Sequence, residues 1–296
     1  MNKGVLYGFG AYFLWGILPV YWKWLHVVPA LQIVAHRVAW SLIFVLILVL
    51  SQRSFTTFKQ SAASPKTIAI YTLAACLVLV NWLIYIWAVN ANFIVETSLG
   101  YFINPLVNVL LGVIFLREKL RPLQWVPVGL AGLGVLYLTI GYGSLPWIAL
   151  ALAFTFGLYG LVKKTAPLES LHGLTLETAI LFLPAVGYLA VMEVQGSGAF
   201  GHLSLVSNIL LVLTGVVTAT PLLLFGAAAR RVNLSTLGIL QYIAPTCQFL
   251  IGVLVYREPF TPDRLVGFSM IWLALLVYWV EGLSQRRRAS LRAVNN

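Results

Sequence analysis

Charged residues are scarce in this sequence, and acidic residues are the scarcest of them. Among 296 residues, 9% are Asp, Glu, Lys or Arg, whereas 60% are hydrophobic. Soluble domains carry roughly a quarter charged residues, so this composition excludes an ordinary soluble globule. The chain is therefore expected to fold in a lipid bilayer.

Cysteine is almost absent, and the common catalytic motifs are missing. Cys76 and Cys247 lie in separate apolar runs, without the spacing of a zinc site or a disulfide framework. No H-E-x-x-H or G-x-S-x-G motif occurs, although an enzyme would need such a group or paired carboxylates. We therefore expect no catalytic residue, no metal and no cofactor.

Long apolar runs are what the sequence has in abundance. A helix needs about 17 to 25 such residues to cross the hydrocarbon core of a membrane. Ten stretches meet this length, and the linkers between them are too short for a soluble domain. The predicted spans are 4–24, 30–51, 67–90, 95–116, 122–140, 146–163, 174–192, 205–229, 234–256 and 262–284.

Basic residues are distributed unevenly between the loops. With a cytoplasmic N-terminus, the inner segments hold 15 Lys and Arg and the outer segments hold three. Because Lys and Arg favour cytoplasmic loops, both termini are predicted to be cytoplasmic, with 285–296 as a basic tail. The net charge of +11 follows from this topology, so no nucleic-acid partner is expected. The expected partners are a small-molecule substrate and membrane lipid, and the expected state is a monomer.

One segment of the chain occurs twice. Residues 105–122 match residues 245–262 at seven of eighteen positions, with a constant offset of 140. Two five-helix repeats are therefore predicted, 1–140 and 141–284. Because five is odd, the copies enter the membrane from opposite sides, which is the inverted-repeat architecture of many secondary transporters. The predicted fold class is an all-α polytopic membrane protein with ten transmembrane helices.

The repeated segments resemble a known family. The stretches "NPLVNVLLGVIFLREKL" and "APTCQFLIGVLVYREPF", with "AYFLWGILPVYWK" in the first span, are similar to the EamA family of the drug/metabolite transporter superfamily. The resemblance covers the whole chain. It implies a permease of the bacterial inner membrane that exports small metabolites or drugs by alternating access, with the two halves around a central cavity. A lipid flippase of the same fold is the alternative, and an intramembrane enzyme is a less favoured one.

Polar side chains repeat at helical spacing within several spans. Tyr101, Asn104 and Asn108 share one helix face, and Asn81 and Tyr85 share another. Polar groups at this depth are costly unless they face protein or water, so the stripes predict a substrate cavity. The same groups can instead hold helices together by hydrogen bonds. The predicted substrate-binding residues are Trp15, His36, Arg37, Asn81, Tyr85, Tyr101, Asn104, Asn108, Thr218, Gln241 and Gln248.

Arg37 lies about two turns into the second span, and its guanidinium stays charged. One interpretation is a structural ion pair with Glu96, the nearest acid by depth, and the other is a contact for an anionic or zwitterionic substrate group. All eight acids lie away from the span centres, which leaves His36 as the titratable group at depth. We therefore expect neutral, zwitterionic or anionic amphiphiles as substrates rather than lipophilic cations.

Prolines and paired charges mark matching points of the two copies. Pro105 and Pro245 each remove a backbone donor and free a carbonyl, which predicts helix breaks beside the binding site, with simple kinks as the alternative. The Arg-Glu pairs at the ends of both copies are predicted gate salt bridges, with simple helix termination as the alternative. These pairs are Arg117, Glu118, Arg257 and Glu258.

Overall fold

The protein is built from helices that run through nearly all of the part described by the structure. This computed structural model describes residues 3–117, 119, 122–142, 144–229, 231–232 and 240–294. The helices are α1 (Lys3–Trp24), α2 (Ala30–Ser51), α3 (Phe55–Ala62), α4 (Pro65–Asn90), α5 (Ile94–Leu116), α6 (Pro122–Tyr142), α7 (Trp147–Thr165), α8 (Ser170–Val194), α9 (Leu205–Ala229), α11 (Ile243–Leu250), the π-helix η1 (Ile251–Val255) and α12 (Pro262–Val294).

Several of these helices suit a bilayer in length and composition. Six are long and apolar enough to cross a membrane, and shorter apolar helices cover Trp125–Ile140, Trp147–Lys163 and Ile243–Val255. Large apolar side chains are exposed on the outside, as at Leu183 (77%) and Ile140 (74%). Such exposure is unfavourable in water and suits contact with lipid. The prediction of an all-α polytopic membrane protein is therefore confirmed.

The helix boundaries follow from proline and from backbone geometry. Pro65, Pro122 and Pro262 each begin a helix, where the missing N–H would have no intrahelical partner. Arg117 and Arg257 follow the ends of α5 and η1 with left-handed φ values of 54° and 52°, a conformation that stops helix propagation. The predicted spans other than 234–256 match these helices closely, except that α12 continues into the basic tail and α3 was not foreseen.

The predicted breaks at proline need a correction in the first copy. Helix α5 runs through Pro105 without interruption, since proline is tolerated in membrane helices where neighbouring groups satisfy the backbone atoms that it frees. Pro245 lies in the first turn of α11, where no intrahelical bond is lost. Residues 233–239, in the predicted span 234–256, lie outside the described residues.

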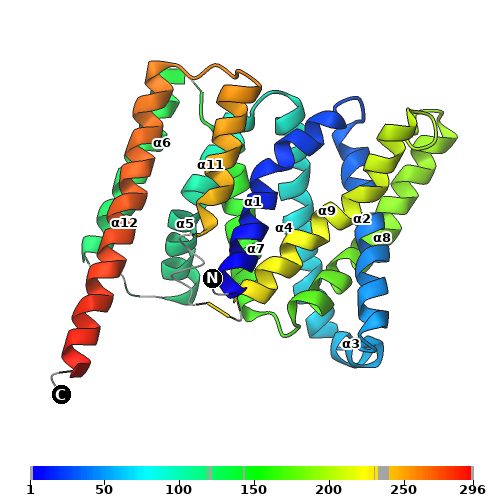
Figure 1. Ribbon diagram of the computed structural model, residues 1–296, viewed down its shortest axis with the longest axis horizontal. Coiled ribbons are helices and arrows are strands. Elements are labelled where there is room, and N and C mark those ends of the chain that lie inside the picture. The colour runs from blue at the N-terminus through cyan, green and yellow to red at the C-terminus, as the bar shows by residue number, and fades with distance from the viewer. Residues whose placement is uncertain are drawn as a thin grey trace.

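The helices form one bundle in which neighbours in space are often distant in sequence (Figure 1). Helix α2 packs against both α8 and α9, α1 packs against α9 and α11, α5 packs against α7, and α6 pairs with α12 at one edge. Glycine permits the closest approaches, since a Cβ atom at Gly215 of α9 would lie 2.4 Å from the carbonyl of Trp40 in α2. Both marked chain ends lie toward the same side of the bundle, opposite the loop between α1 and α2 (Figure 1).

Candidate functional site

Arg37 of α2 is buried where four helices meet. Its side chain is 4% exposed, and its Nε donates a hydrogen bond of 2.7 Å to Thr218 Oγ1 of α9. The guanidinium carbon lies 3.8 Å from the ring centroid of Trp82 in α4 and 5.2 Å from that of Trp22 in α1. Contacts at these distances stabilise a cation through the ring quadrupole. The aromatic rings thus replace part of the water that the charge has lost.

No carboxylate neutralises Arg37 among the residues that the structure describes. Glu96, the partner proposed from its depth, instead lies near the backbone amides of Ile148 and Ala149 at the start of α7. Helix N-termini attract carboxylates because their first amides lack intrahelical partners. The ion-pair interpretation of Arg37 is therefore wrong in this conformation of the protein.

Three buried donors on neighbouring side chains lack hydrogen-bond partners within the described part of the chain. They are Nη1 of Arg37, the hydroxyl of Tyr85 and Nε1 of Trp22. Tyr85 and Tyr101 lie near Arg37, and their rings contact each other edge-to-face at 5.8 Å. We refer to this group of side chains as the Arg37 cluster, which comprises Trp22, Arg37, Trp82, Tyr85, Tyr101 and Thr218.

Unsatisfied donors of this kind are unusual in a protein interior. Most buried polar atoms have a partner, and each one without a partner carries a desolvation cost. A buried charge adds a larger cost. The Arg37 cluster therefore has the properties of a site that a ligand completes.

Other predicted site residues connect helices. Nδ2 of Asn81 donates to the Leu152 carbonyl (3.1 Å) and to Thr155 Oγ1 (2.9 Å) in α7. Asn104 of α5 donates to the Ala153 carbonyl of α7 at 3.0 Å. The Tyr101 hydroxyl reaches Asn81 Oδ1 at 3.4 Å, so these bonds join the site to α7. For the two asparagines, the helix-linking alternative describes the observed contacts.

The remaining predicted residues lie apart from the Arg37 cluster. His36 contacts Phe200 instead, with the two ring centroids 5.3 Å apart. Gln248 of α11 donates to the Trp15 carbonyl of α1 at 3.1 Å. Asn108 is exposed and donates to Asn104 Oδ1 at 3.1 Å, and Gln241 is partly buried just before α11.

One of the predicted gate residues, Glu258, binds backbone amides instead of an arginine. Glu258 is 6% exposed, and its carboxylate accepts hydrogen bonds of 2.7 and 2.8 Å from the amides of Ile94 and Val95 at the start of α5. Arg117 and Arg257 are exposed, while Glu118 lies outside the described residues. Glu258 therefore links the end of η1 to the start of α5.

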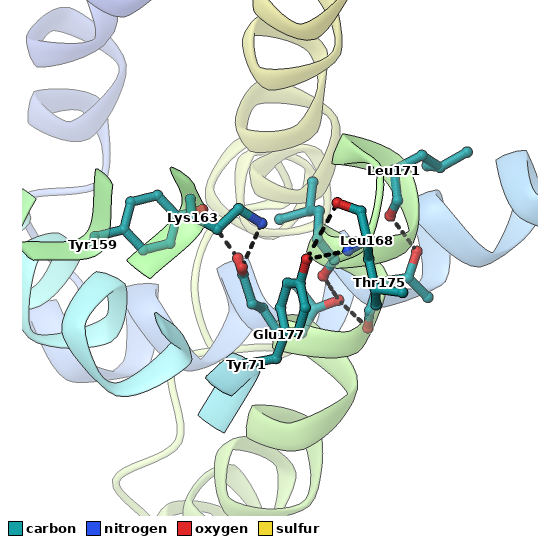
Figure 2. Close-up of polar contacts among 9 residues, drawn as sticks. Tyr71, Tyr159, Lys163, Leu168, Leu171, Thr175 and Glu177 are labelled. Carbon is teal, nitrogen blue, oxygen red and sulfur yellow. Dashed lines mark hydrogen bonds and ion pairs between the residues drawn. The ribbon is translucent and has the colours of Figure 1, made fainter. Parts of the chain in front are cut away.

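A further buried charge, Glu177, was missed in the sequence. Glu177 of α8 is 2% exposed, and its two oxygens accept from Lys163 Nζ at 2.7 Å and from the Tyr159 hydroxyl at 3.1 Å. Figure 2 shows this carboxylate between the two α7 side chains, with Tyr71 of α4 alongside. Glu177 was discounted because it lies off the span centre, although its offset of 140 from Arg37 was a usable signal.

Comparisons with known proteins agree on one family. Residues 2–140 match the EamA-like transporter family. The chain is 48% identical to Protein RarD of Streptomyces exfoliatus over 98% of this chain and 92% of that protein. It is 48% identical to the uncharacterized transporter YojE of Bacillus subtilis over 97% and 96% of the two chains. It is 32% identical to the chloramphenicol-sensitive protein RarD of Pseudomonas aeruginosa over 99% of both.

A solved crystal structure extends the comparison to the fold. Its chain is 18% identical in sequence and has a TM-score of 0.59, covering 94% of this chain and 97% of that one. At this level of identity, the likeness concerns the arrangement of the helices.

Proposed function

Because this chain belongs to the EamA-like transporter family, we propose that it is a secondary transporter that exports small amphiphilic solutes across the bacterial inner membrane by alternating access. The single observation that carries this proposal is the Arg37 cluster. It contains a buried charge and unsatisfied donors where helices from both ends of the sequence meet. Buried ionisable groups in membrane segments commonly mark substrate pathways.

An inverted repeat of ten spans supports alternating access. Helix starts recur at an offset of 140, since Ala30, Pro65 and Pro122 begin α2, α4 and α6 and residues 170, 205 and 262 begin α8, α9 and α12. We propose two units, 1–140 and 141–284, followed by the tail 285–296. In this arrangement both termini are cytoplasmic.

The helix contacts support the same arrangement. The proposed counterparts are α1 and α7, α2 and α8, α4 and α9, α5 and α11, and α6 and α12. Exchanging each helix with its counterpart converts the α5–α7 contact into α11–α1, and the α2–α9 contact into α8–α4. It also converts α1–α9 into α7–α4, and it leaves the pairs α2–α8 and α6–α12 unchanged. A set of contacts that maps onto itself is expected of two halves related by a pseudo-two-fold axis.

The Arg37 cluster lies where relative movement of the halves would change it. Trp22, Arg37 and Trp82 belong to the first proposed half, and Thr218 belongs to the second. Rocking of the halves would therefore alter the surroundings of the guanidinium. We propose that the predicted substrate-binding residues Tyr85 and Tyr101, which lie next to it, line the transport path.

Solute counterflow in proteoliposomes tests the proposal. Vesicles holding the purified protein are loaded with unlabelled solute, and entry of the labelled solute is followed. Chloramphenicol, after the name of the relative from Pseudomonas aeruginosa, and benzoate serve as a neutral and an anionic probe. We expect counterflow of at least one probe with the unmodified protein and with Lys59→Gln, a change at an exposed residue of α3. Arg37→Gln should abolish it.

A parallel measurement separates the main alternative. Movement of a labelled phospholipid between leaflets without solute counterflow would favour the lipid flippase. Absence of both activities in vesicles that contain folded protein would overturn the proposal of a transporter.

A further inference from the structure

We propose that the Arg37 cluster binds the carboxylate of a small organic monoanion, whose apolar body lies among the aromatic rings. The inference rests on the proposed function and deepens it by naming the substrate class. The unsatisfied groups of the cluster are a guanidinium nitrogen, a phenol hydroxyl and an indole nitrogen. Each of them can donate a hydrogen bond, and two of the three have no capacity to accept one. Their natural complement is a ligand rich in acceptors.

The charge of the site selects an anion among such ligands. Within the described residues, Arg37 is 4% exposed and has no carboxylate partner. An unpaired charge in the interior is strongly unfavourable, and an anion with good geometry removes that penalty. A cationic substrate would instead add a second positive charge. The site therefore discriminates against cations by repulsion as well as by the absence of acceptors.

A ligand with one negative charge matches the single positive charge of the Arg37 cluster. Lys23, the basic residue of the neighbouring helix, is engaged elsewhere, because its Nζ donates to Asn92 Oδ1 at 2.6 Å. One guanidinium is thus available to balance the ligand. The planar fork of arginine suits a carboxylate, whereas a phosphate dianion would leave one negative charge without compensation.

The aromatic side chains of the Arg37 cluster favour an organic ligand over a bare inorganic anion. Trp82 lies against the guanidinium at 3.8 Å, and Trp22 lies at 5.2 Å. Tyr101, which contacts Tyr85, is only partly buried. Aromatic surfaces provide little for a hydrated ion but stabilise an apolar or aromatic body. An amphiphile with a carboxylate head fits both parts of the site.

The inference is tested by the thermal stability of the purified full-length protein in detergent. The probes are benzoate, its neutral amide benzamide, the cation benzylammonium and sodium chloride, all at matched ionic strength. We expect benzoate to raise the melting temperature with a saturable dose dependence, and the other three to give no saturable shift. Arg37→Gln should abolish the benzoate shift.

Tyr85→Phe provides a test that does not depend on a large change in the fold. The variant removes only a hydroxyl that has no hydrogen-bond partner among the described residues, so folding should be preserved. Loss of one hydrogen bond to a charged ligand should weaken apparent benzoate affinity about tenfold or more. Tyr188→Phe, a change of the same kind at a partly buried residue of α8, should leave affinity unchanged.

Several results would overturn the inference. These are an equal shift with benzamide or benzylammonium, an equal shift with chloride alone, and equal benzoate affinity in Tyr85→Phe and Tyr188→Phe. Failure of the proposed function would look different. Benzoate binding without counterflow of any solute would support the anion site and overturn the proposal of a transporter. Chloramphenicol counterflow without benzoate binding would support transport and overturn the anion site.

Discussion

Arg37 and Glu177 lie at matching positions of the two proposed halves, but only Glu177 has a partner of opposite charge among the described residues. They lie 140 residues apart, each seven residues after the start of its helix at Ala30 or Ser170. Both are buried among aromatic side chains. The charge of Glu177 is balanced within the protein, whereas that of Arg37 is balanced by no side chain among the described residues.

The neighbouring lysines explain how this difference arises. Lys163 of α7 pairs with Glu177, and the residue 140 positions before it, Lys23 of α1, lies near Arg37 in the sequence. Lys23 turns to the loop between α4 and α5, where it donates to Asn92 Oδ1 and lies over the ring of Tyr256. A closed ion pair is a structural element, whereas an open charge with spare donors is available for function. We therefore propose that the Glu177 site serves stability and that the Arg37 site serves ligand binding.

The largest loss of stability is expected from Glu177→Gln. This change leaves Lys163 without its counter-charge, and breaking a buried pair from one side is costly. Because the Lys163 side chain is 24% exposed, water can recover part of the loss, and we expect about 2 to 3 kcal/mol. Thermal unfolding of the purified protein in detergent measures it.

A double variant shows whether the charge itself is responsible. Lys163→Met combined with Glu177→Leu removes both charges and should recover much of the stability lost in Glu177→Gln. If Glu177→Gln unfolds at the temperature of the unmodified protein, the ion pair has no structural role and the contrast with Arg37 fails.

A smaller loss is expected from Glu258→Ala. The carboxylate caps the start of α5 by accepting from Ile94 and Val95, and removal of a helix cap costs about 1 to 2 kcal/mol. Glu258→Gln, which retains one acceptor oxygen, should lose less than Glu258→Ala in the same unfolding measurement. Equal losses in both variants would indicate that charge, rather than capping, is what matters at this position.

Much of the helical fold was accessible from the sequence, because the length of an apolar run directly reflects the thickness of the membrane. The importance of Arg37 was also accessible from the sequence, because a charged side chain within a membrane span is costly whichever face of the helix carries it. The partners of the charged groups were less accessible. Glu96 and Glu258 lie at backbone amides of helix starts. Every helix start has such amides whatever its sequence, so residue types do not identify partners of this kind. Depth along a helix was a poor guide to pairing, because lateral packing decides which side chains meet.

Asn104→Ala should cost about 1 kcal/mol, as is typical of a hydrogen bond between membrane helices. Its amide joins α5 to α7 through the Ala153 carbonyl, which the change leaves without that donor. Asn108→Ala is the matched control, because Asn108 is exposed and its amide donates to Asn104 of the same helix. We expect less than about 0.5 kcal/mol there. Equal losses would remove the distinction between residues that link helices and residues that do not.

The smallest effect on stability is expected from Arg37→Gln, although it should abolish counterflow. The change removes the hydrogen bond to Thr218 and the stacking on Trp82, together worth about 2 to 3 kcal/mol. It also removes a buried charge whose desolvation penalty is of similar or greater size. The two terms oppose each other, so the unfolding free energy should change by less than about 1 kcal/mol. A loss as large as that of Glu177→Gln would mean that Arg37 is balanced inside the protein after all, and the two halves would then differ in sign of charge but not in role.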